Sequence, residues 1–198
     1  MMVDMRQVVE YLRGFYDFTD RVLIAVGAGG GQFLDVYREA RTILALDTDA
    51  EALGRLGEAV AARGLNDRTE LVQADFFEIT SHAEVVLFEF SLHEMPDPAK
   101  ALLHARSLAP EVVVFEHAPG SEWTHYIVEE EKVRSSTEAM ETFGIKRRSA
   151  FQGEHRFEDH AELLARVASQ GPTAVARIAR FREQRSIVIP LVYGAALL

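Results

Sequence analysis

The sequence predicts an α/β fold with a mostly parallel seven-stranded sheet, helices on both faces and a C-terminal antiparallel hairpin. Three observations lead to this prediction. Strand-length apolar runs alternate with segments of helical period, which indicates βαβ units and a covered parallel sheet. The last two strand candidates, 174–181 and 185–193, are separated by three residues, too few for a parallel crossover. A chain of 198 residues, 48% of them hydrophobic, is long and apolar enough to bury one sizeable core.

The elements follow in order along the chain. Strands are expected at residues 21–26, 42–46, 70–73, 85–90, 112–116, 174–181 and 185–193. Helices are expected at 6–18, from near Gln32, and at 49–62, 98–108, 123–148 and 160–168. Thr48 and Glu51 have the spacing of a capping box, and Gly64 is placed to end that helix in a left-handed conformation. We expect a single domain over residues 1–198 that begins with an N-terminal helix within residues 1–20.

Composition limits the function classes. The formal net charge of −10 argues against a nucleic-acid partner, because phosphate binding needs concentrated Lys and Arg. The chain has no cysteine, which excludes disulfides and thiolate metal sites and suits a cytoplasmic location. No stretch has the ~20 apolar residues of a membrane span, so no membrane partner is expected. The sequence leaves the oligomeric state open, a homodimer included.

The stretch VLIAVGAGGGQFLDV, residues 22–36, places a glycine-rich turn directly after a strand. Glycines at Gly27, Gly29 and Gly31 allow the backbone to turn tightly and approach a ligand at the carboxyl ends of the strands. A purely structural turn is the alternative. Gln32 stands where a dinucleotide-binding fingerprint needs its third glycine, which disfavours a nicotinamide enzyme, and no P-loop ending follows.

Two aspartates follow the next two strands. Asp47 ends the second strand, where a carboxylate can accept hydrogen bonds from both ribose hydroxyls, although a turn or cap role is the alternative. Asp75 ends the third strand before Phe76 and Phe77, so it could accept from an adenine amine while a ring stacks on the base. Packing in the core is the alternative for the phenylalanines. Three markers at the ends of three successive strands favour an adenosyl ligand.

The residues 22–117 resemble the class I S-adenosylmethionine-dependent methyltransferases, a family with a Rossmann-like fold. VLIAVGAGGG resembles the family's first motif, ILALDTDAEAL the second, LVQADFFEI the third, and FEFSLHEMPDP the segment after its fourth strand. The resemblance implies S-adenosylmethionine as cofactor. It implies contacts from the glycine turn to the methionine portion and the ribose, from Asp47 to the ribose hydroxyls, and from Asp75 and Phe76 to adenine. Thr48 is expected among the cofactor-binding residues. Phe90, Ser91 and Leu92 would lie beside the sulfonium methyl.

The chain departs from the family at Ala25, where members usually have an acid that helps to hold the amino end of the methionine. Asp17, Asp20, Glu89 or backbone carbonyls are the candidates to replace it. The departure motivates a second hypothesis, a non-catalytic adenosyl-nucleoside-binding or regulatory protein of the same fold.

Two histidines follow the fourth and fifth strands. His93 and His117 titrate near neutrality, so either could act as a catalytic base for an acceptor that carries a proton, or simply hold a local hydrogen-bond network. Glu94, Glu116, His117 and His125 match no recognised ligand spacing, so no metal site is predicted.

Residues 119–157 are expected to set acceptor specificity, because Trp123, His125, Tyr126, Phe143 and Phe151 could wall an apolar pocket there. Phe143 is the one we expect to pack on the sheet instead. Aromatic residues of the N-terminal helix are expected to close the pocket from the other side. The leading interpretation is a methyltransferase that acts on a small-molecule acceptor.

Overall fold

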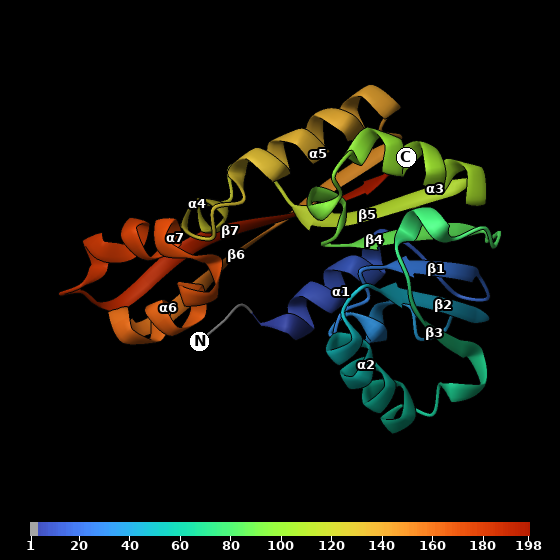
Figure 1. The fold of residues 1–198 in the computed structure, drawn as a ribbon, viewed down its shortest axis with the longest axis horizontal. Coiled ribbons are helices and arrows are strands. Elements are labelled where there is room, and N and C mark those ends of the chain that lie inside the picture. The colour runs from blue at the N-terminus through green and yellow to red at the C-terminus, as the bar shows by residue number, and fades with distance from the viewer. Residues whose placement is uncertain (1–3) are drawn as a thin grey trace.

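The buried apolar runs form one seven-stranded sheet in the computed structural model, which describes residues 4–198 (Figure 1). The first three residues of the expected N-terminal segment lie outside the described residues. The strands are β1 (Val22–Val26), β2 (Thr42–Asp47), β3 (Thr69–Gln73), β4 (Val85–Glu89), β5 (Glu111–His117), β6 (Arg147–Asp159) and β7 (Arg185–Leu197). Their order across the sheet is β3-β2-β1-β4-β5-β7-β6. The predicted fold class is confirmed.

The first five strands are all parallel. β1 pairs with β2 on one side and with β4 on the other, so the strand order reverses at β1. In an open parallel sheet the crevice outside the carboxyl ends of the strands at such a reversal is the expected ligand site. The glycine turn that follows β1 lies at this point.

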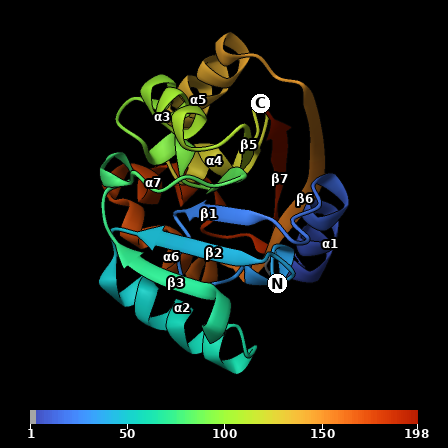
Figure 2. The ribbon, with the colours of Figure 1, turned by 90° about the vertical axis from the view of Figure 1, so that its right-hand side faces the viewer.

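Helices cover both faces of the sheet, as expected. They are α1 (Met5–Phe15), α2 (Ala50–Ala62), α3 (Pro98–Leu108), α4 (Glu122–Tyr126), α5 (Glu130–Phe143), α6 (His160–Val167) and α7 (Pro172–Arg177). Buried residues of α1 and α2 belong to one hydrophobic cluster, and those of α3 and α5 belong to the cluster on the opposite face. Figure 2 shows α2 and α3 on opposite sides of the strands. No helix in the described part of the chain is long and apolar enough to cross a membrane.

The helix expected from near Gln32 is wrong. The chain forms only a short 3₁₀ turn, Leu34–Val36, before β2. Phe33, Leu34, Val36 and Tyr37 are all buried, so this segment is apolar on nearly every side instead of carrying the single stripe of a surface helix.

The long helix expected over residues 123–148 is also wrong. It is two helices, α4 and α5, broken at Val128, which has a φ of +63°. The chain then leaves the helix at Gly144 and enters β6. The sequence of β6 gave no strand signal because seven of its thirteen residues are exposed and six are charged. This edge strand borders only β7 among the described strands.

The C-terminal antiparallel pair exists, but its partners differ from the expectation. Residues 174–181 are helical, and β7 pairs with β6 from Arg147–Leu197 to Asp159–Arg185. Ala174, Ile178 and Phe181 are buried at helical spacing, which explains why this apolar run is not a strand. The connection between the two strands therefore contains α6 and α7, which lie at the far end of the β6–β7 ribbon in Figure 1.

One of the two predicted helix-end signals is correct. Gly64 follows α2 with a φ of +66°, as expected for a left-handed end. The N-terminal cap of α2 is Asp49 and not Thr48, since the Asp49 carboxylate accepts from the backbone N–H groups of Glu51 and Ala52. Asp at this position is as good a cap as Thr.

Candidate functional site

Two neighbouring cavities lie at the carboxyl edge of the sheet. The aspartate cavity, about 520 Å³, is lined by Asp47 and Asp75, and the histidine cavity, about 500 Å³, is lined by His93, His117 and His155. Both cavities share four wall residues: Gly27, Glu89, Phe90 and Glu94. A ligand of two parts can therefore pass from one cavity to the other beside Gly27.

Gly27 is the glycine of the turn that lies against the ligand space. Its φ is +71°, and a Cβ at this position would lie 2.4 Å from the Cβ of Ser91. The Ser91 hydroxyl donates to the carbonyl of Val26 at 2.7 Å, which holds the end of β4 against the turn. Only glycine fits here, because any side chain would meet both a strained backbone and a clash.

Gly29 and Gly31 do not line either cavity in the described part of the chain. The Gly29 N–H donates to Asp47 Oδ2 at 2.9 Å, and a Cβ on Gly31 would lie 3.0 Å from Leu56 of α2. Their positive φ angles and these contacts shape the turn and let α2 approach it. The structure thus places one of the three glycines at the cavities and two behind them.

Asp47 and Thr48 line the aspartate cavity from the end of β2. Asp47 is half-buried; one oxygen accepts from Gly29 and the other from the Asp49 N–H at 3.0 Å. Each carboxylate oxygen keeps a further lone pair, so both can still accept from a ligand. The carboxylate is fixed in position before any ligand arrives.

Asp75 lines the same cavity after β3, where its carboxylate accepts from the Phe77 N–H at 2.9 Å. Phe76 lines the cavity but is only 3% exposed, since its ring packs edge-on against Phe88 and His104. Phe77, half-buried with the Lys100 ammonium 4.9 Å from its ring centre, also lines the cavity. The sequence prediction assigned Phe76 to the site and left Phe77 out. Both residues follow Asp75, and which of the two rings is exposed depends on packing, which the local sequence does not show.

Glu89, which the sequence offered only as a candidate to replace the acid missing at Ala25, lies at the centre of the site. It is 4% exposed, lines both cavities, and accepts a hydrogen bond from the Tyr37 hydroxyl at 2.8 Å. Its other oxygen, Oε2, is buried without a hydrogen-bond partner among the described residues. Burial raises the pKa of Glu89 to about 8, the Tyr37 hydrogen bond lowers it in part, and the charge of Asp47 raises it further. A lone acid in the apolar run VVLFEF was the available sequence signal.

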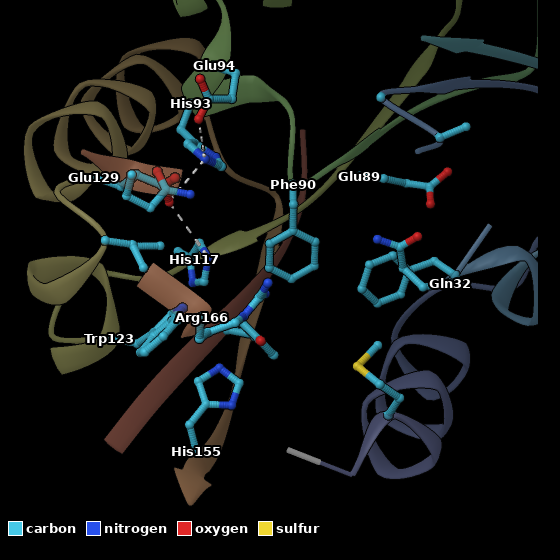
Figure 3. Close-up of a pocket in the computed structure, with 17 residues that line it drawn as sticks. Gln32, Glu89, Phe90, His93, Glu94, His117, Trp123, Glu129, His155 and Arg166 are labelled. Atoms are coloured by element: carbon cyan, nitrogen blue, oxygen red, sulfur yellow. Dashed lines mark ion pairs between the residues drawn. The ribbon is translucent and has the colours of Figure 1, made fainter. Parts of the chain in front are cut away.

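Ala25 is fully buried in the core and cannot take part in the site. Of the candidates to replace a family acid there, Asp17 and Asp20 are exposed and line neither cavity. Glu89, labelled in Figure 3, is the only one of the three that lines the cavities.

Phe90 and Ser91 follow Glu89 where the two cavities meet. Phe90 has a φ of +50°, an unusual conformation for a bulky residue, and its N–H donates to the Phe115 carbonyl at 2.7 Å. Its ring stacks on Phe33 with 5.2 Å between centroids and meets Tyr193 edge-on. Such strain often occurs at ligand sites, where surrounding contacts fix the backbone. Ser91 lines the aspartate cavity.

His93 and His117 stand together at the edge of the histidine cavity (Figure 3). His93 Nδ1 lies 2.5 Å from Glu116 Oε1, and the His93 backbone N–H donates to the other oxygen of the buried Glu116 at 2.7 Å. Burial lowers the pKa of His93, but its bonds to Glu116 and Glu129 outweigh this and raise the pKa to about 10. Burial lowers the pKa of His117 to about 4, so its imidazole is neutral at neutral pH.

The rest of the histidine cavity is built by elements after β5 and by α1. Trp123, from the expected specificity segment, lines it, together with Ile127, Glu129 and His155. The other aromatic candidates lie elsewhere: His125 is exposed, Tyr126 is buried, and Phe143 packs on the cluster of α3. Phe151 contacts Tyr11 and Tyr193 outside the cavity wall.

The wall of the histidine cavity extends beyond residue 157. Arg166 and Gln170 come from the helical insertion between β6 and β7, which the sequence analysis did not include. From α1 the cavity receives Met5 and none of the expected aromatic residues. The described residues place no carboxylate within ion-pair distance of the exposed Arg166.

The comparisons with known proteins agree with this geometry. Residues 24–114 match the family model of the methyltransferase domain. No curated protein matches the sequence. A Bacillus halodurans protein assigned provisionally as a methyltransferase is 14% identical with a TM-score of 0.72, covering 96% of this chain and 97% of its own. The YcgJ protein of Bacillus subtilis is 11% identical with a TM-score of 0.67, covering 97% and 96%.

A third solved structure carries the cofactor. The magnesium protoporphyrin IX methyltransferase of Synechocystis, solved with bound S-adenosylmethionine, is 13% identical with a TM-score of 0.54, covering 97% of this chain and 77% of that one. The family-model match and the shared fold agree with the two cavities. Residues 24–114 match a methyltransferase domain, and the chain has the fold of solved methyltransferases, one of them with bound S-adenosylmethionine.

Proposed function

We propose that this enzyme transfers the methyl group of S-adenosylmethionine to a small-molecule acceptor bound in the histidine cavity. The observation that carries the proposal is the junction of the two cavities at Gly27, Glu89 and Phe90. The adenosyl part occupies the aspartate cavity, and the methionine part crosses the junction. The sulfonium methyl then faces the histidine cavity, where the acceptor binds.

Fixed polar groups of the aspartate cavity support this orientation. Asp47 accepts from the two ribose hydroxyls while its position is held by Gly29 and Asp49. Asp75 accepts from the exocyclic adenine amine, and the base packs between Phe77 and the end of β4 near Ser91. Thr48 and Phe76 complete the wall.

Glu89 takes the role that an acid at position 25 has in other family members. Its unpartnered buried Oε2 provides an acceptor for the ammonium group of the methionine. A buried carboxylate oxygen without a partner is unfavourable, and a bound ammonium relieves that penalty. The chain thus supplies the acid from β4 instead of β1.

The transfer itself is an in-line displacement. A lone pair of the acceptor attacks the methyl carbon, the carbon–sulfur bond breaks, and the electron pair returns to sulfur, which leaves a neutral thioether. The enzyme must align the two partners and exclude water. The aromatic rings of Phe33, Phe90, Trp123 and Tyr193 provide such a wall.

The size and charge of the site favour a small acceptor over a macromolecule. The histidine cavity of about 500 Å³ must hold the methionine end and the acceptor together. A net charge of −10 disfavours the phosphate backbone of a nucleic acid. The exposed guanidinium of Arg166 at the cavity favours an acceptor with an anionic group.

Calorimetry and a methyl-transfer assay test the proposal. We expect S-adenosylmethionine and its demethylated product to bind and NAD not to bind. Asp47→Ala should weaken both sulfur nucleosides equally, by roughly 10- to 100-fold for lost hydrogen bonds to a charged group, while Asp67→Ala should not. With cofactor carrying a labelled methyl group, we expect label in the low-molecular-weight fraction of a cell extract. Label only in retained protein or RNA would contradict a small acceptor.

A further inference from the structure

Three side chains from two separate segments bring donor atoms together at the edge of the histidine cavity. His93 and Glu94 follow β4, and Glu129 precedes α5. One ligand atom of each lies within 4.8 Å of the other two. Figure 3 shows the three side chains converging, with His117 beside them.

The ring nitrogen His93 Nε2 is the centre of this cluster. It lies 3.2 Å from Glu94 Oε1 and 3.5 Å from Glu129 Oε2. One ring nitrogen carries at most one proton, so it cannot donate a linear hydrogen bond to both carboxylates at once. Two donors each 2.0–2.2 Å from one tetrahedral ion lie about 3.3–3.6 Å apart, which is close to the spacing seen here.

A fourth donor stands within reach. His117 Nε2 lies 4.0 Å from Glu129 Oε2, and its Nδ1 is buried without a hydrogen-bond partner among the described residues. Its Nε2 is therefore next to one of the three donors of the cluster and is the candidate for a fourth ligand.

The surroundings orient the ligands. The buried Glu116 binds the opposite ring nitrogen of His93 at 2.5 Å, which leaves Nε2 as the nitrogen that faces the cluster. A carboxylate on the far nitrogen of a metal-ligating histidine is a common feature of such sites. The Lys132 ammonium holds the second oxygen of Glu94 at 2.6 Å, so the first is directed to the cluster.

We propose that His93, Glu94, Glu129 and His117 bind one divalent transition-metal ion of the zinc type at the wall of the histidine cavity. Imidazole and carboxylate donors together suit Zn²⁺ and its neighbours in the first transition row, whereas Mg²⁺ and Ca²⁺ take oxygen ligands. A site adjoining the cavity leaves a position for water or for an oxygen of the acceptor. The sequence predicts no metal site because Glu94, Glu116, His117 and His125 match no recognised ligand spacing, and Glu129 was not among those candidates.

Cobalt spectroscopy on the tag-free, chelator-treated protein is the direct test. Co²⁺ should bind with one ion per chain, produce the visible ligand-field bands of a site with nitrogen and oxygen donors, and be displaced by Zn²⁺. Absence of these bands in the wild-type protein would overturn the proposal, and so would the absence of Zn²⁺ binding in calorimetry.

Variants locate the ion. Glu129→Gln and His93→Asn should each abolish the cobalt bands, and Glu116→Gln should weaken Zn²⁺ by about 10- to 100-fold through lost orientation of His93. His125→Asn is the matched control, since this exposed imidazole contacts Glu130 on the same segment. Loss of metal in the control, or its retention in His93→Asn with a folded circular-dichroism spectrum, would refute the site.

The test is independent of the methyltransferase proposal. Binding of S-adenosylmethionine is measured by calorimetry on the same metal-free protein, because none of the four ligands except Glu94 borders the aspartate cavity. Metal binding without cofactor binding would refute the proposed function alone, and cofactor binding without metal would refute this inference alone.

Discussion

At the scale of single residues, the most informative side chain is Glu89. The position on β1 where the resemblance to the methyltransferases implies an acid is Ala25, which is buried in the core. The acid at the cavities stands on β4 instead. β1 and β4 are paired neighbours, with Ala25 opposite Leu87, so Glu89 lies two residues further toward the carboxyl edge of the sheet. A carboxylate on β4 can therefore reach the space that one on β1 would serve.

Glu89→Gln is expected to weaken S-adenosylmethionine binding by 10-fold or more and to stabilise the ligand-free protein at pH 8. The pKa of the folded Glu89 is about 8, against 4.5 for the ordinary group. Between these values the folded chain holds a proton that the unfolded chain has released, so the free energy of unfolding falls as pH rises from 4.5 to 8. Each pH unit corresponds to at most about 1.4 kcal/mol.

Thermal unfolding of the wild type and Glu89→Gln at pH 5 and pH 8 measures this effect. The stability advantage of the variant should be small at pH 5 and reach a few kcal/mol at pH 8. Glu78→Gln, an exposed carboxyl outside the two cavities, is the control. A variant less stable than the wild type at pH 8 would show that ionised Glu89 does not destabilise the folded protein.

Gly27→Ala is expected to destabilise the protein more than Gly64→Ala. The two glycines have similar φ angles, +71° and +66°, but only at Gly27 does an added Cβ meet an obstacle, the Cβ of Ser91 at 2.4 Å. Both variants carry the backbone penalty of roughly 1–2 kcal/mol for a left-handed L-residue, and the difference between them reports the clash.

Chemical denaturation measures the free energy of unfolding of both alanine variants. Adding Ser91→Gly to Gly27→Ala should recover part of the difference, because it removes the Cβ of Ser91. Equal effects of the two single alanine variants would mean that the turn can move away from β4.

At the scale of elements, the β6–β7 ribbon and its helical insertion line part of the histidine cavity, where we propose that the acceptor binds. Arg177 of α7 links the insertion to the rest of the cavity wall. Its guanidinium lies 2.8 Å from both oxygens of Glu130, and it also donates to the His125 carbonyl. These contacts join α7 to α4 and α5. The aspartate cavity, in contrast, is formed entirely by residues 26–96.

Arg177→Gln should therefore raise the KM for the acceptor and leave the affinity for S-adenosylmethionine unchanged. The substitution should lower the free energy of unfolding by about 1 kcal/mol. This value lies between the usual contribution of an exposed ion pair and that of hydrogen bonds to a charged group. The exposed Arg182→Gln serves as control. Steady-state kinetics and calorimetry separate the two effects, and a parallel loss of cofactor affinity would contradict the division of the site between the two ends of the chain.

At the scale of the whole molecule, stability is concentrated in the centre of the sheet. Every residue of β4 is buried, as are the five middle residues of β5. In contrast, β3 and residues 147–152 of β6 are largely exposed. The slowest amide exchange should therefore lie in β4 and β5, and the fastest strand exchange in β3 and β6. S-Adenosylmethionine should slow exchange near residues 26–31, 47–49 and 74–77. Equal protection across all strands would contradict this picture.

Much of the fold could be predicted because local signals and burial agree in residues 22–117. There β1, β2, β4 and β5 contain continuous apolar runs, and α2 carries one apolar stripe between a cap and a glycine. The signals conflict beyond residue 117. β6 is charged because one ribbon face is in water, and residues 174–181 are apolar because a helix buries one side of them. Pairing partners such as β6 and β7 are chosen by contacts across the fold and not by local propensity.

The sequence by itself determined the parallel sheet and predicted an adenosyl ligand at its carboxyl edge, because glycines and acids at strand ends act locally. Only the tertiary structure decided which of these residues face the ligand. It placed Gly27 at the cavities and Gly29 and Gly31 behind them, and it turned Glu89 inward with one oxygen unpartnered. It also brought Glu129 to His93 across 36 positions of sequence. Such contacts depend on how distant segments pack, so no spacing along the chain encodes them.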